Sequence, residues 1–342
     1  MGQIKKRVSM QNIADHLGIS KNSVSLALGG KTGVSDETRE LVIKTAQQMQ
    51  YNYKIPSEEN NPKKLLTIIP EYIKDDSYFY NQVYWAIEMR AKECGHIAVL
   101  CSVTDDMQQK NELPSMYYEL DFIGIITVGV LSKSYMQFLH DKTDCLVSVD
   151  HNYSDLNIDC ILTANLDSAY RLTQYVIAQG HTEIGFVGSV DMTSSIFERW
   201  CGYQKAMLHA GLTINPKLSI LHASPLKVLL SDPQELTEVL MQMEHLPSAF
   251  ITGGDRIAIS LMSALTLMGK QVPDDISVAG FDNIEATTMV TPALTTINVK
   301  RNLLGETAVN RLIYRSEHPD EPAIKKELFA DIVLRDSVIG FT

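Results

Sequence analysis

The sequence predicts a small all-α domain at the N-terminus, followed by a much larger α/β body. Residues 9–49 carry short helical patterns punctuated by serine and glycine. From Lys64 onward, short apolar runs alternate with amphipathic stretches, which is typical of parallel strands covered by helices on both faces. The chain has 342 residues, enough for the small domain and one or two larger ones.

Serine residues mark the start of three short helices in the first segment. A serine before a helix can accept a hydrogen bond from a backbone N–H of the first turn, and the three serines are Ser9, Ser20 and Ser35. The helices they predict cover Met10–Leu17, roughly Lys21–Ala27, and a stretch from Asp36 onward. Gly18 suits the tight turn between the first two.

Apolar residues at helical spacing give these helices a common core. We expect the inward side chains to be Ile13, Ala14, Leu17, Val24, Leu28, Leu41, Val42, Ala46 and Met49. Two short helices joined by a glycine turn and closed by a third are typical of a helix-turn-helix, whose second helix enters the DNA major groove. A three-helix bundle without a DNA role is the alternative.

Motifs along nearly the whole chain resemble the LacI/GalR family of bacterial transcription regulators. In the first segment they are Ile13-Ala14, Leu17-Gly18-Ile19-Ser20, Ser23-Val24-Ser25, Val34-Ser35 and Thr38-Arg39. In the body they are Gln179-Gly180-His181 with residues 184–188, residues 198–203, residues 272–283 and residues 292–297. The resemblance implies a sequence-specific DNA-binding transcriptional regulator, of repressor type, that acts as a homodimer on double-stranded operator DNA.

The candidate DNA contacts come from the N-terminal arm, the second helix and the residues that flank this helix. They are Lys5, Lys6, Arg7, Ser20, Lys21, Asn22, Ser23, Ser25, Leu26 and Lys31. Asparagine can pair with adenine and lysine with guanine, whereas basic residues also meet phosphates. Most family members have an arginine where this chain has Leu26. A leucine can contact a thymine methyl group but cannot make a bidentate guanine contact.

The charge distribution fits a DNA reader carried on an acidic body. The whole chain has a formal net charge of -11. Residues 1–54 hold eight basic and four acidic side chains, so they carry +4 and the remainder carries -15. A basic head can meet phosphates while the acidic body is repelled by them. Chance asymmetry in so short a segment is the alternative explanation.

A polar, proline-containing linker at 54–64 separates the headpiece, residues 1–53, from the body, residues 65–342. The family places a hinge helix here, with a leucine that wedges into the minor groove. This chain instead carries Glu58 and Glu59, which phosphates would repel. We hypothesise that the wedge is absent or built differently, and that effector control of DNA affinity is weaker than in wedge-bearing relatives.

The body is expected to contain two doubly wound parallel-sheet subdomains. The expected strands are Leu65–Ile69, Ile97–Val103, Phe122–Val128, Cys145–Val149, Ile184–Val187, Leu218–Leu221, Ala249–Thr252 and Ile276–Phe281. Expected helices include Asn81–Lys92, Leu166–Gln179, Arg199–Ala210, Pro233–Met243, Arg256–Met268 and Leu303–Tyr314. In such sheets, ligands bind beyond the carboxyl ends of the strands.

The resemblance implies a periplasmic-binding-protein type I body with an effector cleft between its subdomains. The N-subdomain would comprise residues 65–162 and 296–327, and the C-subdomain residues 163–295 and 328–342. The candidate effector contacts are Tyr78, Phe79, Asp150, Arg199, Asp255 and Asp282. Carboxylates, a guanidinium and aromatic rings suit a sugar. A turn role for Asp282, a salt bridge for Arg199 and a core position for the aromatic residues are the alternatives.

The sequence offers little sign of catalysis. It has no P-loop, zinc-protease, nucleophile-elbow or dinucleotide-binding motif, so we expect neither an enzyme nor a cofactor or metal. Five scattered cysteines and the lack of a long apolar run favour a cytoplasmic protein without a membrane span. A catabolite-control-type regulator that answers a phosphorylated protein partner, and a pure sugar-binding protein, are the alternative functions.

Overall fold

The structure is a computed structural model that divides the chain into two compact units, Met1–Pro62 and Lys63–Thr342. It describes residues 8–29, 33–49, 51, 62–73, 79–221 and 233–341. We call the described part of the first unit the headpiece and the second unit the body. Each is described by itself.

The headpiece contains the three helices predicted from its serines: α1 (Met10–Leu17), α2 (Lys21–Leu28) and α3 (Asp36–Gln48). The Ser20 and Ser35 hydroxyls accept backbone N–H groups of the first turns of α2 and α3 at 3.0 and 3.3 Å. At α1 the Asn12 side-chain oxygen instead accepts the Ser9 backbone N–H at 2.9 Å. Gly18 ends α1 in the left-handed conformation, at φ 68°.

The headpiece core confirms most of the predicted inward side chains. Its fully buried members are Ile13, Ala14, Val24, Ala27, Leu28, Val42 and Ala46. The prediction for Leu41 is wrong, because this side chain is 52% exposed. The buried face of α3 runs through residues 42, 45, 46 and 49, and Leu41 lies about 100° around the helix from Val42.

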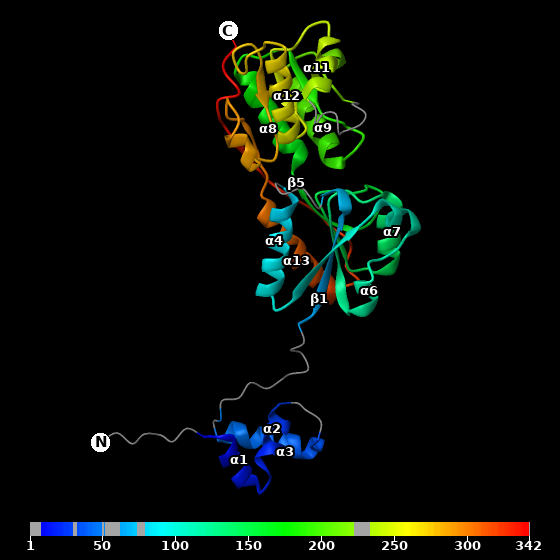
Figure 1. The fold of residues 1–342 in the computed structure, drawn as a ribbon, viewed down its shortest axis with the longest axis vertical. Helices are drawn as coiled ribbons and strands as arrows, with labels where there is room; N and C mark the ends of the chain where they lie inside the picture. Colours follow the sequence, from blue (N-terminus) through cyan, green and yellow to red (C-terminus); the bar gives the residue numbers. More distant parts are fainter. Residues whose placement is uncertain are drawn as a thin grey trace, which may run out of the picture. The chain divides into compact units, whose positions relative to one another are not determined.

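The first lobe of the body is built on a six-stranded parallel sheet. Its strands are β1 (Lys64–Pro70), β2 (Ile97–Val103), β3 (Phe122–Val128), β4 (Leu146–Val149), β5 (Asp159–Thr163) and β10 (Lys325–Leu328), in the spatial order β10-β5-β4-β3-β1-β2. Helices α4 (Tyr80–Glu93) and α13 (Arg301–Glu317) cover one face; α6 (Met116–Glu119) and α7 (Lys133–Lys142) cover the other (Figure 1). The short elements η2 (Glu71–Ile73) and α5 (Asp105–Lys110) complete the lobe.

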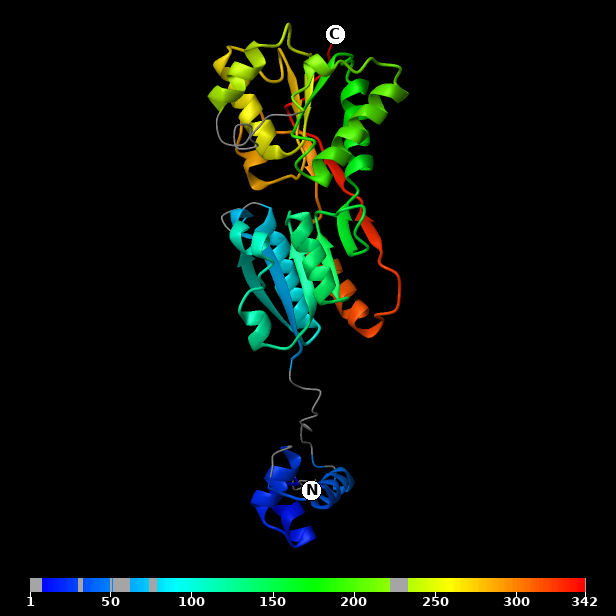
Figure 2. The ribbon, with the colours of Figure 1, turned by 90° about the vertical axis from the view of Figure 1, so that its right-hand side faces the viewer.

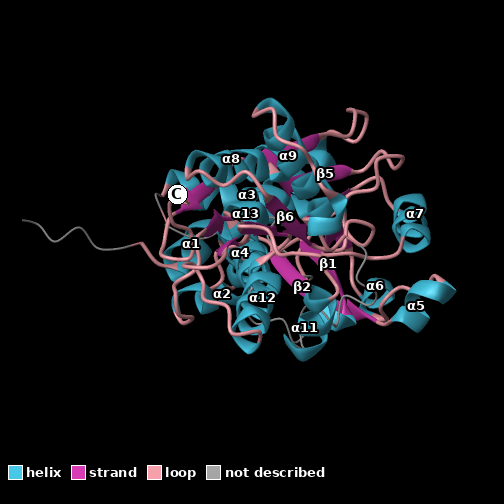
Figure 3. Cartoon of the chain, turned by 90° about the horizontal axis from the view of Figure 1, so that it is seen from above, coloured by secondary structure: helices cyan, strands magenta, loops and turns pink. Residues whose placement is uncertain are grey.

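The alternation of side chains along the strands explains the two helical layers. Leu65 belongs to the same buried cluster as Val83 of α4 and Leu312 of α13, whereas the next residue, Leu66, belongs to the cluster that contains Tyr135 of α7. Because successive side chains of a strand point to opposite faces, a continuous apolar strand must be covered on both sides. Figure 3 shows the strands of the body in magenta and its helices in cyan, seen from above.

The second lobe repeats this plan on a smaller sheet, with the order β6-β7-β8. Its strands are β6 (Ile184–Val187), β7 (Ala249–Thr252) and β8 (Ser277–Ala279). Its helices are α8 (Asn165–Ala178) and α9 (Ser194–His209) on one face, α11 (Pro233–Met241) and α12 (Asp255–Leu267) on the other, and the short η3 (Pro216–Leu218) and η4 (Glu285–Thr288).

Segments far apart in the sequence cross between the two lobes. The chain leaves the first lobe after β5 and returns through β9 (Thr296–Asn298), which pairs antiparallel with β11 (Asp331–Val333). Figure 2 shows the C-terminal segment, drawn in red, passing from the lower lobe to the upper one. The doubly wound parallel-sheet class predicted from the sequence is therefore confirmed.

The expected strand at Leu218–Leu221 is wrong. Asn215 accepts the Lys217 backbone N–H through its side chain, and Pro216 follows it, so this segment begins as the 3-10 turn η3. Only Ile220 then pairs with β6, as an isolated bridge to Val187. Conversely, the helix and strand patterns did not single out β5, β9, β10 or β11, all of which contain polar residues.

Candidate functional site

The outer face of α2 is polar and is the candidate DNA-reading surface. Val24, Ala27 and Leu28 face the headpiece core, so the opposite side of the helix faces solvent. Lys21, Asn22 and Ser25 are exposed there. The hydroxyl of Ser23 lies 2.8 Å from that of Ser20, which fixes both at the helix start.

Leu26 is the one large apolar side chain among the predicted DNA contacts, and it is half-buried. It lies over Gly33, where a Cβ atom would sit 3.3 Å from Leu26 Cδ1. The other predicted DNA contacts, Lys5, Lys6, Arg7 and Lys31, lie outside the described residues, as does most of the linker.

The predicted effector residues of the body gather where the two lobes meet. Asp150 follows β4 of the first lobe, Asp255 follows β7 of the second, and Asp282 follows β8. All three therefore lie at carboxyl ends of parallel strands, where ligands bind in folds of this kind. We call these residues, together with Arg199 of α9, the lobe-junction cluster.

Asp150 is a buried carboxyl group with one unsatisfied oxygen. Its Oδ2 accepts the Tyr80 hydroxyl at 3.2 Å, whereas its Oδ1 has no hydrogen-bond partner. Burial raises the pKa of Asp150 to about 7, and the Asp282 charge adds to this, against the lowering effects of Arg199 and of the Tyr80 hydrogen bond. Its backbone is left-handed, at φ 66°, which is uncommon for a residue other than glycine.

Arg199 holds the second-lobe side of the cluster together. Its Nη1 donates to the Gly253 carbonyl at 2.6 Å and lies 3.3 Å from Asp282 Oδ1. Its Nε donates to the Asn165 side chain at 3.0 Å, and its guanidinium stacks 3.7 Å from the ring centre of Phe281. The structure thus supports the alternative roles considered for two of these residues in place of effector contact. Arg199 forms a salt bridge, and Asp282 lies in a turn with a left-handed backbone.

Asp255 is fully buried and both of its oxygens are engaged. The Thr296 hydroxyl donates to Oδ1 at 2.5 Å and the Ile284 backbone N–H donates to Oδ2 at 2.9 Å. Burial, together with the Asp282 charge, raises the pKa of Asp255 well above its ordinary value. This geometry favours a role in positioning the turn that carries Asp282; direct effector contact by Asp255 stays a prediction.

The aromatic side of the cluster comes from the start of α4. Phe79 is buried and packs edge-on against Tyr80, with ring centres 5.0 Å apart. Arg301, which the sequence analysis missed, places its guanidinium 5.9 Å from the Phe79 ring and donates to the Asn283 carbonyl. A cation in the first turn of a helix is unfavourable next to the positive end of the helix dipole. The position of Arg301 at the start of α13 was therefore the sequence feature that could have singled it out. Tyr78 lies outside the described residues.

Three hydrogen bonds join the lobes beside this cluster. The Ser195 hydroxyl donates to the Asp150 carbonyl at 2.9 Å, the Asn152 backbone N–H donates to the Ser194 hydroxyl at 3.3 Å, and His151 Nδ1 lies 3.1 Å from the same hydroxyl. Burial lowers the pKa of His151 to about 4, so its ring is neutral near pH 7. The sequence pattern gave no indication of these serines.

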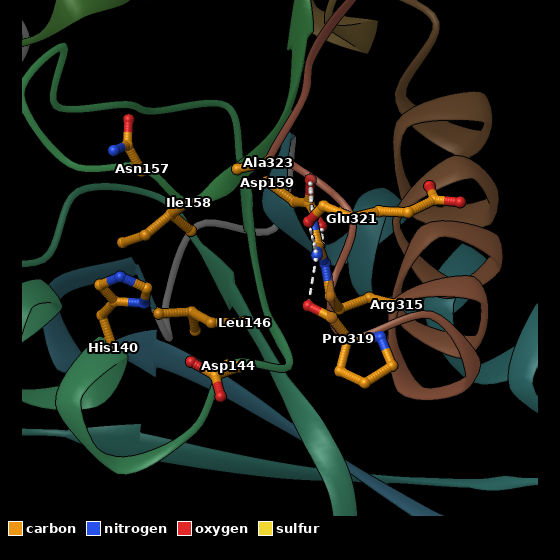
Figure 4. Close-up of a pocket in the computed structure, with 10 residues that line it drawn as sticks. All are labelled: His140, Asp144, Leu146, Asn157, Ile158, Asp159, Arg315, Pro319, Glu321 and Ala323. Atoms are coloured by element: carbon orange, nitrogen blue, oxygen red, sulfur yellow. Dashed lines mark hydrogen bonds and ion pairs between the residues drawn. The ribbon is translucent and has the colours of Figure 1, made fainter.

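A separate pocket of about 220 Å³ lies at the opposite, amino-terminal edge of the first-lobe sheet. Figure 4 shows Arg315 bound to Asp159 and to the carbonyls of Pro319 and Glu321 on one side, with the His140 ring on the other. Arg311 Nε lies 2.9 Å from Asp159 Oδ2 as well. Asp159 thus has two cationic partners and is a structural anchor at the start of β5.

The described residues contain neither a membrane-spanning helix nor a cluster of metal ligands. No helix in this part of the chain is both long and apolar enough to cross a membrane. Within the same residues, His, Cys, Asp and Glu side chains form no group of three that would hold a metal ion. All five cysteines are free thiols, and Cys160 is buried.

Sequence comparisons match both units to known families. Residues 9–53 match the family of bacterial regulatory proteins of lacI type, and residues 173–338 match the periplasmic binding protein-like domain. The transcriptional repressor PurR of Glaesserella parasuis is 26% identical over 96% of this chain and 98% of its own length. PurR of Pasteurella multocida is 27% identical with the same coverage.

Solved structures share the fold at lower identity. The lac repressor dimer bound to operator and the anti-inducer ONPF superposes with a TM-score of 0.71, at 21% identity, over 98% of this chain and 100% of that one. The regulator CelR in complex with cellobiose gives 0.70 at 18% identity, over 97% and 100% of the chains.

A helix-turn-helix headpiece joined to a two-lobed α/β body is the architecture of a bacterial DNA-binding transcription regulator. Residues 9–53 form a DNA-binding domain of the lacI family of bacterial regulatory proteins, and residues 173–338 form a periplasmic binding protein-like domain. These matches confirm the prediction of a regulator and not an enzyme.

Proposed function

We propose that the protein is a transcriptional repressor that binds a two-fold operator as a homodimer and is controlled by a sugar at the lobe-junction cluster. The polar outer face of α2 is the observation that carries the proposal of DNA binding. Lys21, Asn22 and Ser25 are exposed on this helix, whereas its other face is buried in the headpiece core. The family match over residues 9–53 and the PurR repressors support the same reading.

The lobe-junction cluster supports control by a small molecule. Residues from both lobes meet there, so a ligand that contacts both changes the balance between arrangements of the lobes. Asp150 and Asp282 supply acceptors for sugar hydroxyls, and Phe79 supplies an aromatic neighbour. Cellobiose in the CelR complex shows that a protein of the same fold holds a sugar, and it supplies a first probe.

An exposed apolar edge of the first lobe supports the homodimer. Strand β2 is the last strand of the six-stranded sheet, so one of its edges is unpaired within the described chain. Ile97 and Leu100 on β2 and Trp85 and Met89 on the neighbouring α4 are 37–60% exposed. A second copy on this edge would bury these side chains and set the spacing of the two headpieces.

The effector proposal is tested by measuring operator affinity with and without sugars. Full-length protein is titrated against a selected operator duplex in the presence of cellobiose, ribose or glucose, each at saturating concentration. We expect one sugar class to change the affinity about 5- to 100-fold, in the range of ~1–3 kcal/mol typical of allosteric coupling. The upper limit of about 100-fold follows from the atypical linker, which we expect to weaken effector control of operator affinity.

The controls separate the alternatives. A nucleoside and a phosphorylated carrier protein are added in parallel. A response to either one, without any sugar response, contradicts the sugar proposal but keeps the regulator. A sugar effect well above 100-fold contradicts the weakened coupling expected from the linker. Binding of a sugar without any operator binding favours a pure sugar-binding protein.

A further inference from the structure

The pocket at the amino-terminal edge of the first-lobe sheet is large enough for a small ligand. Its volume is about 220 Å³, which corresponds to roughly seven water molecules in the liquid. Figure 4 shows His140, Leu146 and Asp144 across the pocket from Arg315 and Pro319. The lobe-junction cluster lies at the opposite edge of this sheet, so an occupant of the pocket is separate from the proposed effector.

Arg315 forms a fixed wall of the pocket and has no donor left for a ligand. Its Nε and Nη2 donate to the Asp159 carboxylate at 2.9 and 3.3 Å. Its Nη1 donates to the Pro319 and Glu321 carbonyls, and its Nη2 also donates to the Pro322 carbonyl at 2.9 Å. A guanidinium has five N–H groups, and these five bonds use all of them. An anionic ligand would therefore find no unengaged cation on this wall.

Three other lining side chains have polar groups without partners. His140 Nδ1 is buried and makes no hydrogen bond among the described residues. The Asp144 carboxylate and the Asn157 amide likewise make no hydrogen bond or ion pair within that part of the chain. Buried polar atoms are almost always hydrogen-bonded, so the partner of the His140 nitrogen comes from outside the chain, from water or from a ligand.

The charges at the pocket favour a cation. The lining acids are Asp144, Asp159 and Glu321, and Arg315 is the one lysine or arginine in the lining. When Arg311, which pairs with Asp159, is included, three acids face two arginines and one negative charge remains in excess. Helices α7 and α13 also end beside the pocket, and a helix C-terminus carries a partial negative charge.

We propose that this pocket binds a small organic cation, an amine on a short carbon chain, whose ammonium group contacts Asp144 and His140 Nδ1. An ammonium group has three donors, and a carboxylate oxygen and a neutral imidazole nitrogen are acceptors for two of them. The buried side chains of Leu146 and Ile158 supply an apolar wall for the carbon chain. A metal ion fits less well, because no three His, Cys, Asp or Glu side chains of the described residues group as metal ligands.

Calorimetric titration of the full-length protein tests this site with three probes. Cadaverine, pentanediol and glutarate share one carbon-chain length and carry positive, zero and negative charge at neutral pH. We expect cadaverine to bind at one site per chain, with a dissociation constant in the micromolar to millimolar range, whereas the other two do not bind. DNA is left out, because organic cations also bind its phosphates.

Three variants locate the binding site. Asp144→Asn should weaken cadaverine binding about tenfold, because it removes a charge-assisted hydrogen bond. His140→Phe keeps a ring of similar size but removes Nδ1, so it should also weaken binding. Asp141→Asn changes an exposed acid of α7 outside the pocket lining and should bind cadaverine like wild type. Urea denaturation of each variant checks that the body is folded.

Each contrary outcome overturns a specific part of this proposal. Absence of cadaverine binding at millimolar concentration means that water alone fills the pocket. Equal binding of pentanediol, or stronger binding of glutarate, overturns the cationic class of ligand. Wild-type affinity in both Asp144→Asn and His140→Phe places the binding elsewhere and overturns this site. None of these outcomes bears on the proposed DNA binding or on the proposed effector.

Discussion

Replacing Asp150 by asparagine is expected to stabilise the body above neutral pH. Asp150→Asn should raise the free energy of unfolding by about 2–4 kcal/mol at pH 8. The pKa of Asp150 is raised from 3.8 to about 7 in the folded protein. Each pKa unit corresponds to about 1.4 kcal/mol, so roughly three units set the upper limit. Asparagine keeps an oxygen for the Tyr80 hydroxyl and carries no charge into the buried site.

The sign of the pH dependence follows from proton binding. Between about pH 4 and 7 the folded state keeps the Asp150 proton that the unfolded state has lost. The folded state then binds more protons, so wild-type stability falls as the pH rises through this window. Above pH 7 the cost is complete and constant. The gain in the variant should therefore be absent near pH 3, grow from about pH 4 to 7, and level off.

This measurement uses urea denaturation followed by tryptophan fluorescence, because both tryptophans, Trp85 and Trp200, lie in the body. The exposed Asp141→Asn variant is the matched control and should unfold like wild type at every pH. Equal free energies of unfolding for Asp150→Asn and wild type at pH 8 would contradict the claim that the buried Asp150 charge lowers the stability of the body. A residue that lowers stability within a ligand site is typical of a site kept for function.

Replacing Asp159, at the amino-terminal edge of the first-lobe sheet, is expected to destabilise the body. Asp159→Asn should lower the free energy of unfolding by about 3–5 kcal/mol, because it leaves two buried arginines without their anion. Asp159 is bonded by Arg315 Nε and by the Ile324 backbone N–H at 2.9 and 2.7 Å, and it pairs with Arg311. Burial alone would raise the pKa of Asp159, but these partners outweigh it and lower the pKa.

An exposed ion pair supplies the control for this prediction. Asp155 pairs with Lys133 at the surface of the same lobe, where both side chains are more than half exposed. Asp155→Asn should leave the free energy of unfolding close to that of wild type, because an exposed ion pair contributes little to stability. The structural account of Asp159 fails when the two variants lose stability equally in the same denaturation experiment.

Local signals were enough to predict the headpiece. Ser20 and Ser35 cap their helices as expected, and Gly18 ends α1, because these features depend on neighbouring residues only. The prediction for Leu41 was wrong because the run of three apolar residues at 41–43 does not reveal which of them face the core. The packing of α3 against the other helices decided that Val42 is buried.

The body shows the same division between local and long-range information. The apolar strands β1, β3 and β7 were evident from their composition, whereas β9 and β11 pair only because two distant segments cross between the lobes. At the lobe-junction cluster, carboxyl groups at strand ends could be predicted. The engagement of Asp255 by Thr296 and Ile284, and of Asp150 by Ser195, depends on tertiary contacts that spacing does not encode.

The most direct test of the central claim is to select bound duplexes from a random DNA pool with the full-length protein at near-physiological salt. We predict a two-fold motif with an A·T-containing half-site, as expected for a dimer that reads DNA through α2. The selection is repeated with candidate sugars and with a phosphorylated carrier protein, in case a co-repressor is required. Failure to enrich any motif under all of these conditions would contradict a sequence-specific regulator.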